Sequence, residues 1–566
     1  MTRLRNRAPL SGRGALAVAL VGTACALAAT TPVATAQTTP DKTRVYVVVL
    51  DGLRPDEVAL MPFLSSLAAD GTFYQQARAV MVAETIPNHV AMVTGVYPDR
   101  SGIVANDFPA VPGGTKAEAG AGDEAVGAGD PRLLQADSMF TLIQRQCPQL
   151  VASSVMSKDY LFTVMDHDRT GDGKPDADSN FDNTSDPSFI PIAGLTPDER
   201  TIVEATRVSQ ELDPDFLFVN LGAIDRMGHA DAAGGVTGVL TDLVNPVVDG
   251  IPQEPPARAV QRSNTDSYLR TFVEQLKADG RWEDTALVVT ADHSMDWSLP
   301  TDSVTIYPDF EADPLLAGQV LVAQNGGASL YSLRDRDAPQ AAARLSRMRE
   351  IALATDGVDE ALYRLPNALD GGTEHWVGAV HPDWHQTHPR SGDLLVTVQD
   401  TRRSSEPGTM SNPLPGNHGM PSTLRIPMVV GGGIGVVPSS VDGSTDPSTR
   451  AADQAENVDL APTAAWLLGV DPPAGGFDGR VLSEAFTARP APTCVGAASP
   501  TPTASTGTGS GTGSGSGTGS GSGSDGGAAD GRAGDGLAAT GPAGAGAVAV
   551  LALLLVGAGL VVRRQH

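Results

Sequence analysis

Cysteine is scarce in this chain, with three in 566 residues. Cys25 lies in an N-terminal segment that we expect to be removed, which leaves Cys147 and Cys494. Two thiolates cannot build a thiolate zinc site, so any metal site has to rest on aspartate and histidine. In an exported chain the two cysteines either pair, tying the end of the globular region to its body, or remain free thiols, and the sequence leaves both open.

Basic residues are also few, with 39 Lys and Arg against 66 Asp and Glu, which gives a formal net charge of −27. Six of the arginines lie in terminal segments that hold no acidic residue, so their removal takes the mature charge to about −33. A nucleic-acid-binding surface is therefore not expected, because it needs a basic patch. A small anionic substrate remains compatible, since bound metal ions supply local positive charge.

Long apolar runs are confined to the two ends of the chain. Residues 1–36 are typical of a secretory signal peptide: a region with four arginines, an apolar core at 15–29, and Ala-Thr-Ala at 34–36 as the cleavage site. The alternative is a membrane span, which the short run and its interruption at Thr30, Thr31 and Pro32 disfavour. We expect export.

The C-terminal segment combines a spacer with a short motif. Residues 495–536 are rich in Gly, Ser and Thr and cannot bury a core, which indicates a flexible spacer. Residues 537–566 hold LAATG, an apolar run and two arginines, an order that resembles a sortase cell-wall sorting signal. The resemblance implies sortase cleavage after Thr540 and attachment of Thr540 to peptidoglycan; the alternative is a plain membrane anchor. In both cases the catalytic region lies outside the cell.

The region 43–494 is predicted to be one α/β catalytic domain. Continuous apolar runs such as VYVVVL, DFLFVNL and TALVVTA alternate with helical patterns. This alternation favours a mostly parallel central sheet sandwiched between helices. In such sheets ligands bind beyond the carboxyl ends of the strands.

Chemically active side chains follow three of these runs. Aspartates end or closely follow each run, and histidines come at ligand spacing after them; the set is Asp51, Asp225, His229, Asp292, His293 and His418. Carboxylate and imidazole ligands without thiolate suit zinc, and also manganese or iron. The sequence therefore predicts two divalent metal sites, with zinc the first choice.

Thr85 opens the segment ETIPNH between the first two runs. Pro87 suits the first turn of a helix, which places Thr85 at or just before the N-cap, where backbone N–H groups favour a phosphate. Metal coordination can activate the hydroxyl as a nucleophile, and Asn88 on the same turn would donate to a phosphoryl oxygen. The alternative makes Thr85 an ordinary cap and Asn88 a turn residue. Together with the metal set, the segment favours phosphoryl transfer or hydrolysis.

Five ordered motifs resemble the alkaline phosphatase superfamily, in its type I phosphodiesterase and nucleotide pyrophosphatase branch. They are VVVLDGLRPDEV, ETIPNHVAMVTGVYPDRSGI, AIDRMGH, TADHSMD and GNHGM, within a resemblance that spans about residues 45–486. The resemblance implies an alkaline-phosphatase-like fold with Thr85 as the covalent nucleophile and Asn88 as the stabiliser of the transition state. It implies one zinc on Asp51, Thr85, Asp292 and His293, and another on Asp225, His229 and His418.

The leading hypothesis is an exported metal-dependent hydrolase of phosphodiester or pyrophosphate bonds, acting on a small anionic phosphoester. A second hypothesis is a phosphomonoesterase or phosphonate hydrolase on the same site, because SKDYL, with Lys158, resembles a segment of phosphonoacetate hydrolases. A third is an inactive, wall-displayed binding protein, which the sorting signal and spacer also fit.

A separate acidic cluster lies at 166–178. Aspartates alternate with glycines there, and oxygen ligands in that pattern can wrap calcium; the candidate ligands are Asp166, Asp168, Asp172 and Asp176. No glutamate stands at the twelfth position of an EF-hand loop. The alternative is a solvated acidic loop.

Overall fold

The computed structural model describes thirteen segments of the chain. They are residues 42–109, 125–127, 133–161, 168–171, 174–181, 183–190, 195–229, 247–248, 251–365, 375–377, 384–407, 416–443 and 454–494. The predicted signal peptide, spacer and sorting signal lie outside these residues, as do Asp166 and Asp172. Within the described segments, no helix has the length and apolarity needed to cross a bilayer.

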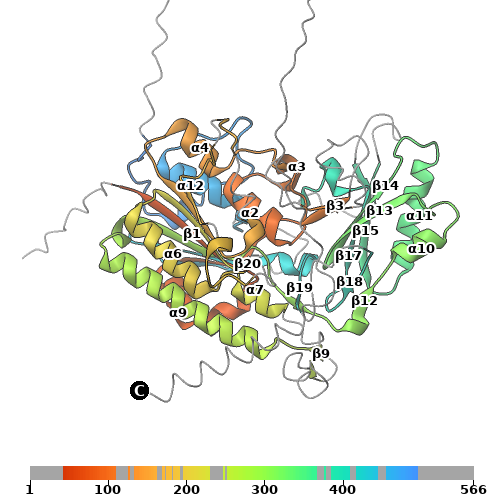
Figure 1. The fold of residues 1–566 in the computed structure, drawn as a ribbon, viewed down its shortest axis with the longest axis horizontal. Helices are drawn as coiled ribbons and strands as arrows, with labels where there is room; N and C mark the ends of the chain where they lie inside the picture. The colour runs from red at the N-terminus through yellow and green to blue at the C-terminus, as the bar shows by residue number, and fades with distance from the viewer. Residues whose placement is uncertain are drawn as a thin grey trace, which may run out of the picture. The chain divides into compact units, whose positions relative to one another are not determined.

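An eight-stranded sheet forms the centre of the fold (Figure 1). Its strands in spatial order are β21 (Ser439–Val441), β2 (Thr72–Arg78), β20 (Arg425–Gly432), β10 (Thr285–Thr290), β1 (Arg44–Leu50), β7 (Phe216–Leu221), β5 (Ala152–Met156) and β6 (Ser179–Asn180). Only β20 runs against the other seven. The mostly parallel sheet is confirmed, and strands β1, β7 and β10 are buried along their whole length.

Helices cover both faces of this sheet (Figure 1). One layer contains α1 (Pro62–Asp70), α6 (Asp198–Glu211), α7 (Ala223–Gly228) and α9 (Pro256–Ala278). The other contains α2 (Thr85–Thr94), α4 (Met139–Gln146) and α12 (Leu460–Leu468), with the short α3 (Pro98–Ser101) after α2. Because both faces are covered, the strands can be continuous apolar runs, as the sequence indicated.

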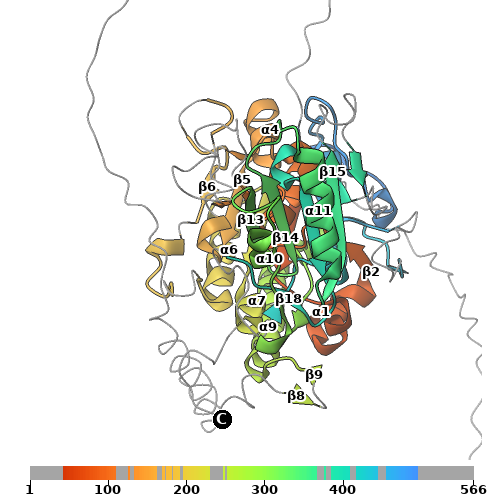
Figure 2. The same cartoon turned by 90° about the vertical axis from the view of Figure 1, so that its right-hand side faces the viewer.

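A second sheet of five antiparallel strands was not predicted from the sequence (Figure 2). Its order is β13 (Val320–Asn325), β14 (Ala328–Leu333), β17 (Leu394–Val398), β15 (Val358–Leu365) and β16 (His375–Val377). The run at Leu394–Val398 looked like another strand of the main sheet because it is apolar on both faces. One face packs on α10 (Tyr307–Ala312) and α11 (Ala341–Ala354) through residues such as Tyr331 and Leu394, and Leu330 and Leu395 belong to the main core.

Four short strand pairs complete the described elements. They are β3 (Asp107–Pro109) with β4 (Ala125–Gly127), β8 (Val247–Val248) with β9 (Ile251–Pro252), β11 (Asp296–Trp297) with β19 (Gly416–Asn417), and β12 (Ser303–Val304) with β18 (Arg403–Ser404). The β11–β19 pair matters for the site, because it places His418 beside the loop that carries His293.

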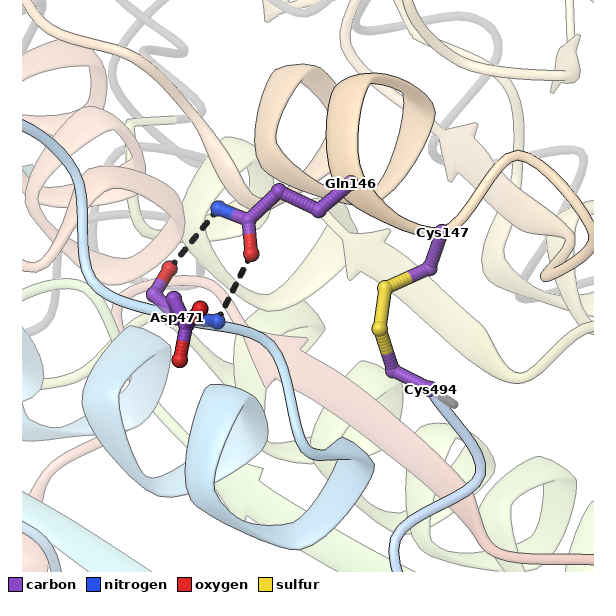
Figure 3. The surroundings of a disulfide bond; sticks show 4 residues. All are labelled: Gln146, Cys147, Asp471 and Cys494. Atoms are coloured by element: carbon purple, nitrogen blue, oxygen red, sulfur yellow. Dashed lines mark hydrogen bonds between the residues drawn. A yellow bond between two sulfur atoms is a disulfide. The ribbon is translucent and has the colours of Figure 1, made fainter. Parts of the chain in front are cut away.

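Cys147 and Cys494 form a disulfide, so of the two alternatives for the cysteines the structure has the pair (Figure 3). The bond joins the end of α4 to the last described residue, 347 positions later in the chain. Gln146 and the backbone of Asp471 exchange two hydrogen bonds next to it, of 3.0 and 2.8 Å (Figure 3). The end of the domain is thereby tied to its body.

Candidate active site

The three aspartates meet at the carboxyl edge of the central strands. Asp51 directly follows β1, Asp292 lies two residues after β10, and Asp225 lies in the first turn of α7, after β7. Strand β1 lies between β10 and β7, so the three carboxylates converge, and all three are buried. The sequence predicted a strand running up to Asp225; the strand instead ends at Leu221 and a short helix carries the aspartate.

The histidines turn their Nε2 atoms toward these carboxylates. His293 Nε2 lies 3.2 Å from Asp292 Oδ2, and His229 Nε2 lies 3.1 Å from Asp225 Oδ1. His418 Nε2 lies 3.1 Å from His229 Nε2. Two groups have ligand atoms close enough for one ion each: Asp51 with Asp292 and His293, and Asp225 with His293 and His418. His293 is common to both groups, so the two candidate positions are adjacent.

The opposite nitrogen of each imidazole fixes its tautomer. His229 Nδ1 lies 3.1 Å from the Gly416 carbonyl oxygen and His418 Nδ1 lies 3.0 Å from that of Ala83. His293 Nδ1 lies 2.9 Å from the Ser294 carbonyl oxygen. A carbonyl only accepts, so Nδ1 carries the hydrogen and the Nε2 lone pair faces the centre of the site. This is how histidine ligands of metals are commonly held.

The donor set fits divalent cations. Asp225 Oδ1 and Asp292 Oδ2 are buried without a hydrogen-bond partner, and the Nε2 lone pairs of His229 and His418 face each other. Buried acceptor atoms that converge without donors are unfavourable unless a cation lies among them. Oxygen and imidazole ligands in this mixture suit zinc, manganese or iron.

The protonation states also suit metal binding. Burial lowers the pKa of His293, and burial together with His293 and His229 lowers the pKa of His418 well below its usual value. Both imidazoles are therefore neutral, as a ligand must be. Burial raises the pKa of Asp292, and the neighbouring Asp51 adds to this rise, whereas the charged amine of Lys158 outweighs burial and holds the pKa of Asp225 well below its usual value.

Thr85 stands at the first residue of α2, with Glu84 as the N-cap. It was predicted at or just before the cap, and it lies one position inside the helix. Its Oγ1 is 3.2 Å from His293 Nε2, so the hydroxyl faces the Asp51, Asp292 and His293 group. The N-terminus of α2 thus places the Thr85 hydroxyl and backbone N–H groups beside one candidate metal position.

The prediction for Asn88 is wrong. Its Nδ2 donates to the carbonyl oxygens of Val80, Val82 and Glu84 at 3.3, 3.2 and 2.8 Å. Its Oδ1 accepts from the Val80 N–H and from Asn457 Nδ2. The amide is therefore fully used in holding the loop before α2, and no hydrogen is left for a phosphoryl oxygen.

Asn106 fits the role that the sequence analysis gave to Asn88, that of a donor near Thr85. Its Oδ1 accepts from the Ile86 N–H at 2.8 Å, one residue after Thr85, and its Nδ2 donates to Glu84. Its side chain is only partly buried, and the second hydrogen on Nδ2 can point to a ligand. Asn106 lies 21 positions after Thr85, so helix periodicity could not indicate it.

Lys158 is the buried cation of the site. Its Nζ donates to Asp51 Oδ1 and Asp225 Oδ2, both at 2.8 Å, and to Thr85 Oγ1 at 3.3 Å. Burial lowers its pKa, but Asp225 and Asp51 raise it further, so the net pKa is well above the usual value and the amine is charged. Sequence reasoning noted Lys158 only for its resemblance to another branch, and its contact with both carboxylates comes from the fold.

Two buried residues, His89 and Asn220, hold the backbone of Thr85 in place. His89 Nδ1 lies 2.8 Å from the Thr85 carbonyl oxygen, and Asn220 Nδ2 lies 3.0 Å from His89 Nε2 and 2.9 Å from Asp51 Oδ2. Burial lowers the pKa of His89 to about 4, so it stays neutral near pH 7. These residues connect the start of α2 to the end of β1.

The acidic cluster is only partly described. Asp176 is buried and accepts from the Thr141 hydroxyl and from the Arg169 N–H, and Asp168 accepts from the Gly171 N–H. These carboxylates have hydrogen-bonding roles within the protein. The described residues give no further support to calcium.

The family model for type I phosphodiesterase / nucleotide pyrophosphatase matches residues 45–421, about two thirds of the chain. The chain belongs to this family. The family is known for a two-metal active site, and the described residues of this chain include two candidate ligand groups. The type I phosphodiesterase family consists of phosphoric ester hydrolases, so the enzyme class predicted from the sequence is confirmed.

Curated relatives match only over a short stretch. The mouse bis(5'-adenosyl)-triphosphatase is 35% identical over 67 residues, which is 12% of this chain and 15% of that protein. The human ectonucleotide pyrophosphatase/phosphodiesterase family member 1 is 39% identical over 61 residues, 10% of this chain and 7% of that protein. The chain thus aligns with well under a fifth of their length.

Solved structures match over much more of the fold. Human ectonucleotide pyrophosphatase/phosphodiesterase 5 has a TM-score of 0.55 at 15% identity and covers 79% of this chain and 100% of its own. The murine protein 5, an inactive variant in complex with AMP, has a TM-score of 0.53 at 16% identity and covers 76% and 96%. At this identity the likeness establishes the alkaline-phosphatase-like fold and no more.

Proposed function

We propose that this type I phosphodiesterase family member is an exported, metal-dependent hydrolase of phosphodiester or pyrophosphate bonds that acts through a covalent intermediate on Thr85. One observation carries the proposal. The Thr85 hydroxyl, at the start of α2, lies next to His293, the residue common to both candidate metal groups. A hydroxyl in that position is the group best placed to attack a bound phosphoryl centre.

Two divalent ions, zinc as first choice, would be held by separate ligand sets. Asp51, Thr85, Asp292 and His293 would hold one, and Asp225, His229 and His418 the other. When bound, the ions supply the positive charge that activates the hydroxyl and stabilises the phosphoryl oxygens.

Three residues of the chain would carry out the other parts of the reaction. Thr85 Oγ1 forms a bond to phosphorus as the leaving oxygen departs, and water later cleaves the phosphothreonine and regenerates the hydroxyl. Asn106 donates its second amide hydrogen to a phosphoryl oxygen as charge develops there. Lys158 keeps Thr85 Oγ1 in place and offsets part of the charge of Asp51 and Asp225.

The charge balance favours an anionic substrate. Three carboxylates and a threonine alkoxide carry four negative charges, and two divalent ions with Lys158 carry five positive charges. The loaded site would therefore carry a net positive charge in a protein of net charge −27. A phosphoester anion is the ligand that such a site attracts.

The names of relatives support pyrophosphate and diester bonds. One matched relative is a bis(5'-adenosyl)-triphosphatase and another is an ectonucleotide pyrophosphatase/phosphodiesterase. Export by residues 1–36 and sortase attachment to peptidoglycan through Thr540 complete the proposal, with the plain anchor as the alternative for the C-terminus. The prefix "ecto" in the second name agrees with action outside the cell.

Two other functions compete. A phosphomonoesterase or phosphonate hydrolase is favoured by Lys158, which adds a cation directly at the nucleophile. An inactive display protein is disfavoured, because all seven proposed ligands are present and Thr85 is in position.

The test compares the wild-type full chain with one variant. Wild type loaded with zinc should cleave p-nitrophenyl thymidine monophosphate or p-nitrophenyl phosphate, and the faster of the two assigns diester or monoester chemistry. Thr85→Ala should abolish turnover, a loss of at least about 10³-fold, while metal analysis still finds two ions per chain. Turnover by Thr85→Ala would overturn the covalent mechanism, and absence of both metal and turnover in wild type would leave the display protein.

A further inference from the structure

Two cationic side chains lie near one aromatic ring beside the nucleophile. Lys158 Nζ lies 5.9 Å from the centre of the Tyr160 ring, and Arg226 Cζ lies 5.6 Å from the same centre. Lys158 Nζ is also 3.3 Å from Thr85 Oγ1. The cluster of Lys158, Tyr160 and Arg226 therefore reaches the reacting centre through Lys158.

Arg226 of α7, which is partly exposed, and Arg258 of α9 lie in the same helical layer but differ in their partners. Arg258 is fully buried and donates through its terminal nitrogens to Glu57, Glu254 and the Gly52 carbonyl oxygen, whereas its Nε has no hydrogen-bond partner. Arg226 Nε is buried without a hydrogen-bond partner, and none of the ion pairs found among the described residues includes its guanidinium. A guanidinium with unused buried donors is costly unless a ligand accepts from it.

This guanidinium is charged and lies near the site. An arginine side chain stays protonated at every pH at which the protein is folded, so Arg226 carries a positive charge. Arg226 is the residue after Asp225 in α7, so the same short helix presents a proposed metal ligand and this cation. The ring of Tyr160 lies beside the guanidinium and the Lys158 amine, and so holds the two cations on one side of the site.

We propose that Arg226, with Lys158 and Tyr160, binds a second negative charge of the substrate. The charge is carried either by the reacting phosphoryl group, as in a monoester, or by the neighbouring phosphate of a pyrophosphate. The planar fork of arginine matches two phosphate oxygens, and charge-assisted hydrogen bonds of this kind are strong. The inference rests on the proposed function and adds to it a residue that selects among phosphoesters.

A simple diester carries one negative charge, which Lys158 and the proposed ions already offset. The Arg226 guanidinium therefore interacts most strongly with a substrate that brings a second negative charge next to it. Arg226 would thus raise kcat/KM for doubly charged substrates and change it little for singly charged ones.

The experiment measures kcat/KM of the full chain on three substrates. The singly charged p-nitrophenyl thymidine monophosphate is compared with p-nitrophenyl phosphate, charged twice on the reacting phosphorus, and with ADP-ribose, charged on two neighbouring phosphates. Arg226→Gln should lower kcat/KM by about 10- to 100-fold on a doubly charged substrate and by less than about 3-fold on the diester. The doubly charged substrate that is affected identifies where the second charge lies.

Matched variants separate recognition from folding. Arg226→Lys keeps the charge and should restore part of the preference, and Arg270→Gln removes the same charge from the exposed face of α9 and should change nothing. Equal losses on all three substrates, or no loss on any, would overturn the role of Arg226 while leaving the proposed function standing. No turnover of any substrate by wild type would instead overturn the proposed function.

Discussion

Two asparagines show how side-chain direction decides a role at the residue scale. Asn88 lies three residues after Thr85 on the same helix, yet five hydrogen bonds hold its amide against the preceding loop and Asn457. Asn106 comes from a different segment and reaches the N-terminus of α2 through the Ile86 N–H. The residue close in sequence is structural, and the one farther away has a hydrogen available for a ligand.

Replacing Asn106 by alanine should lower activity, whereas replacing Asn88 by alanine should lower stability. Asn106→Ala should lower kcat by about 10²-fold with little change in the melting temperature, because one donor to the phosphoryl oxygen is lost. Asn88→Ala should lower the free energy of unfolding by about 2–4 kcal/mol, because buried partners lose their hydrogen bonds. Steady-state kinetics and chemical unfolding of both variants check this, and a purely kinetic defect in Asn88→Ala would contradict the assignment.

At the scale of elements, Asp198 joins three helices. It is the first residue of α6 and fully buried, accepts from the Ala223 N–H at the start of α7, and accepts from the Thr265 hydroxyl of α9. Burial raises its pKa to about 6, although both hydrogen bonds lower it. The carboxylate that positions α7, and with it Asp225, therefore carries a buried charge at neutral pH.

Asp198→Asn should stabilise the protein in a pH-dependent way. The folded pKa is above the unfolded value of about 3.8, so the contribution of Asp198 to the stability of wild type is greatest below pH 4 and falls as the pH rises to about 6. Asparagine keeps the shape without the charge, and the free energy of unfolding should exceed that of wild type by about 3 kcal/mol at pH 7.5 and by about 1 kcal/mol at pH 4.5. Urea unfolding at the two pH values measures the gap, and a constant gap would contradict the role of the charge.

On the scale of the whole molecule, the disulfide closes a loop of nearly the entire domain. Cys147 follows the last residue of α4, which precedes β5, and Cys494 donates its N–H to the Leu468 carbonyl oxygen at the end of α12. The bond thus lies toward the amino end of β5, whereas the site lies at the carboxyl ends of β1, β7 and β10.

Removing the disulfide should therefore affect stability and not catalysis. The double variant Cys147→Ser with Cys494→Ser should lose about 2–5 kcal/mol of unfolding free energy, since a cross-link over a long loop restricts the unfolded chain. Its kcat/KM should stay within about 2-fold of wild type. Gln146→Ala, which removes only the neighbouring hydrogen bonds with Asp471, is the matched control and should lose about 1 kcal/mol.

Chelation should also act on the whole fold, because the site joins segments from Asp51 to His418. Removing divalent ions with EDTA should abolish turnover and lower the melting temperature, and zinc should restore both. An ion at 100-fold above its Kd stabilises by about 2.7 kcal/mol, since it binds only the folded protein. Calorimetry with and without EDTA measures the shift, and unchanged melting with retained activity would show that the acceptor cluster needs no metal.

The sequence by itself determined the central sheet and indicated most of the candidate ligand set. Buried parallel strands are continuous apolar runs, and their ends meet at one edge, so Asp51 and Asp292 could be located before the fold was known. Asp225 with His229, and Asp292 with His293, are close in the chain, so local spacing was enough to relate them. Membership of the family follows from the same motifs, since they occur in order along residues 45–421.

Only the tertiary structure decided which other polar side chains gather around the candidate site. Lys158, Asn106 and Arg226 come from separate loops and helices, and nothing in their local sequence shows where their side chains point. The second sheet was missed for a related reason: a strand buried on both faces reads the same whether its neighbours are parallel or antiparallel. Local periodicity specifies the burial of an element, whereas long-range packing specifies its partners and therefore the shape of the site.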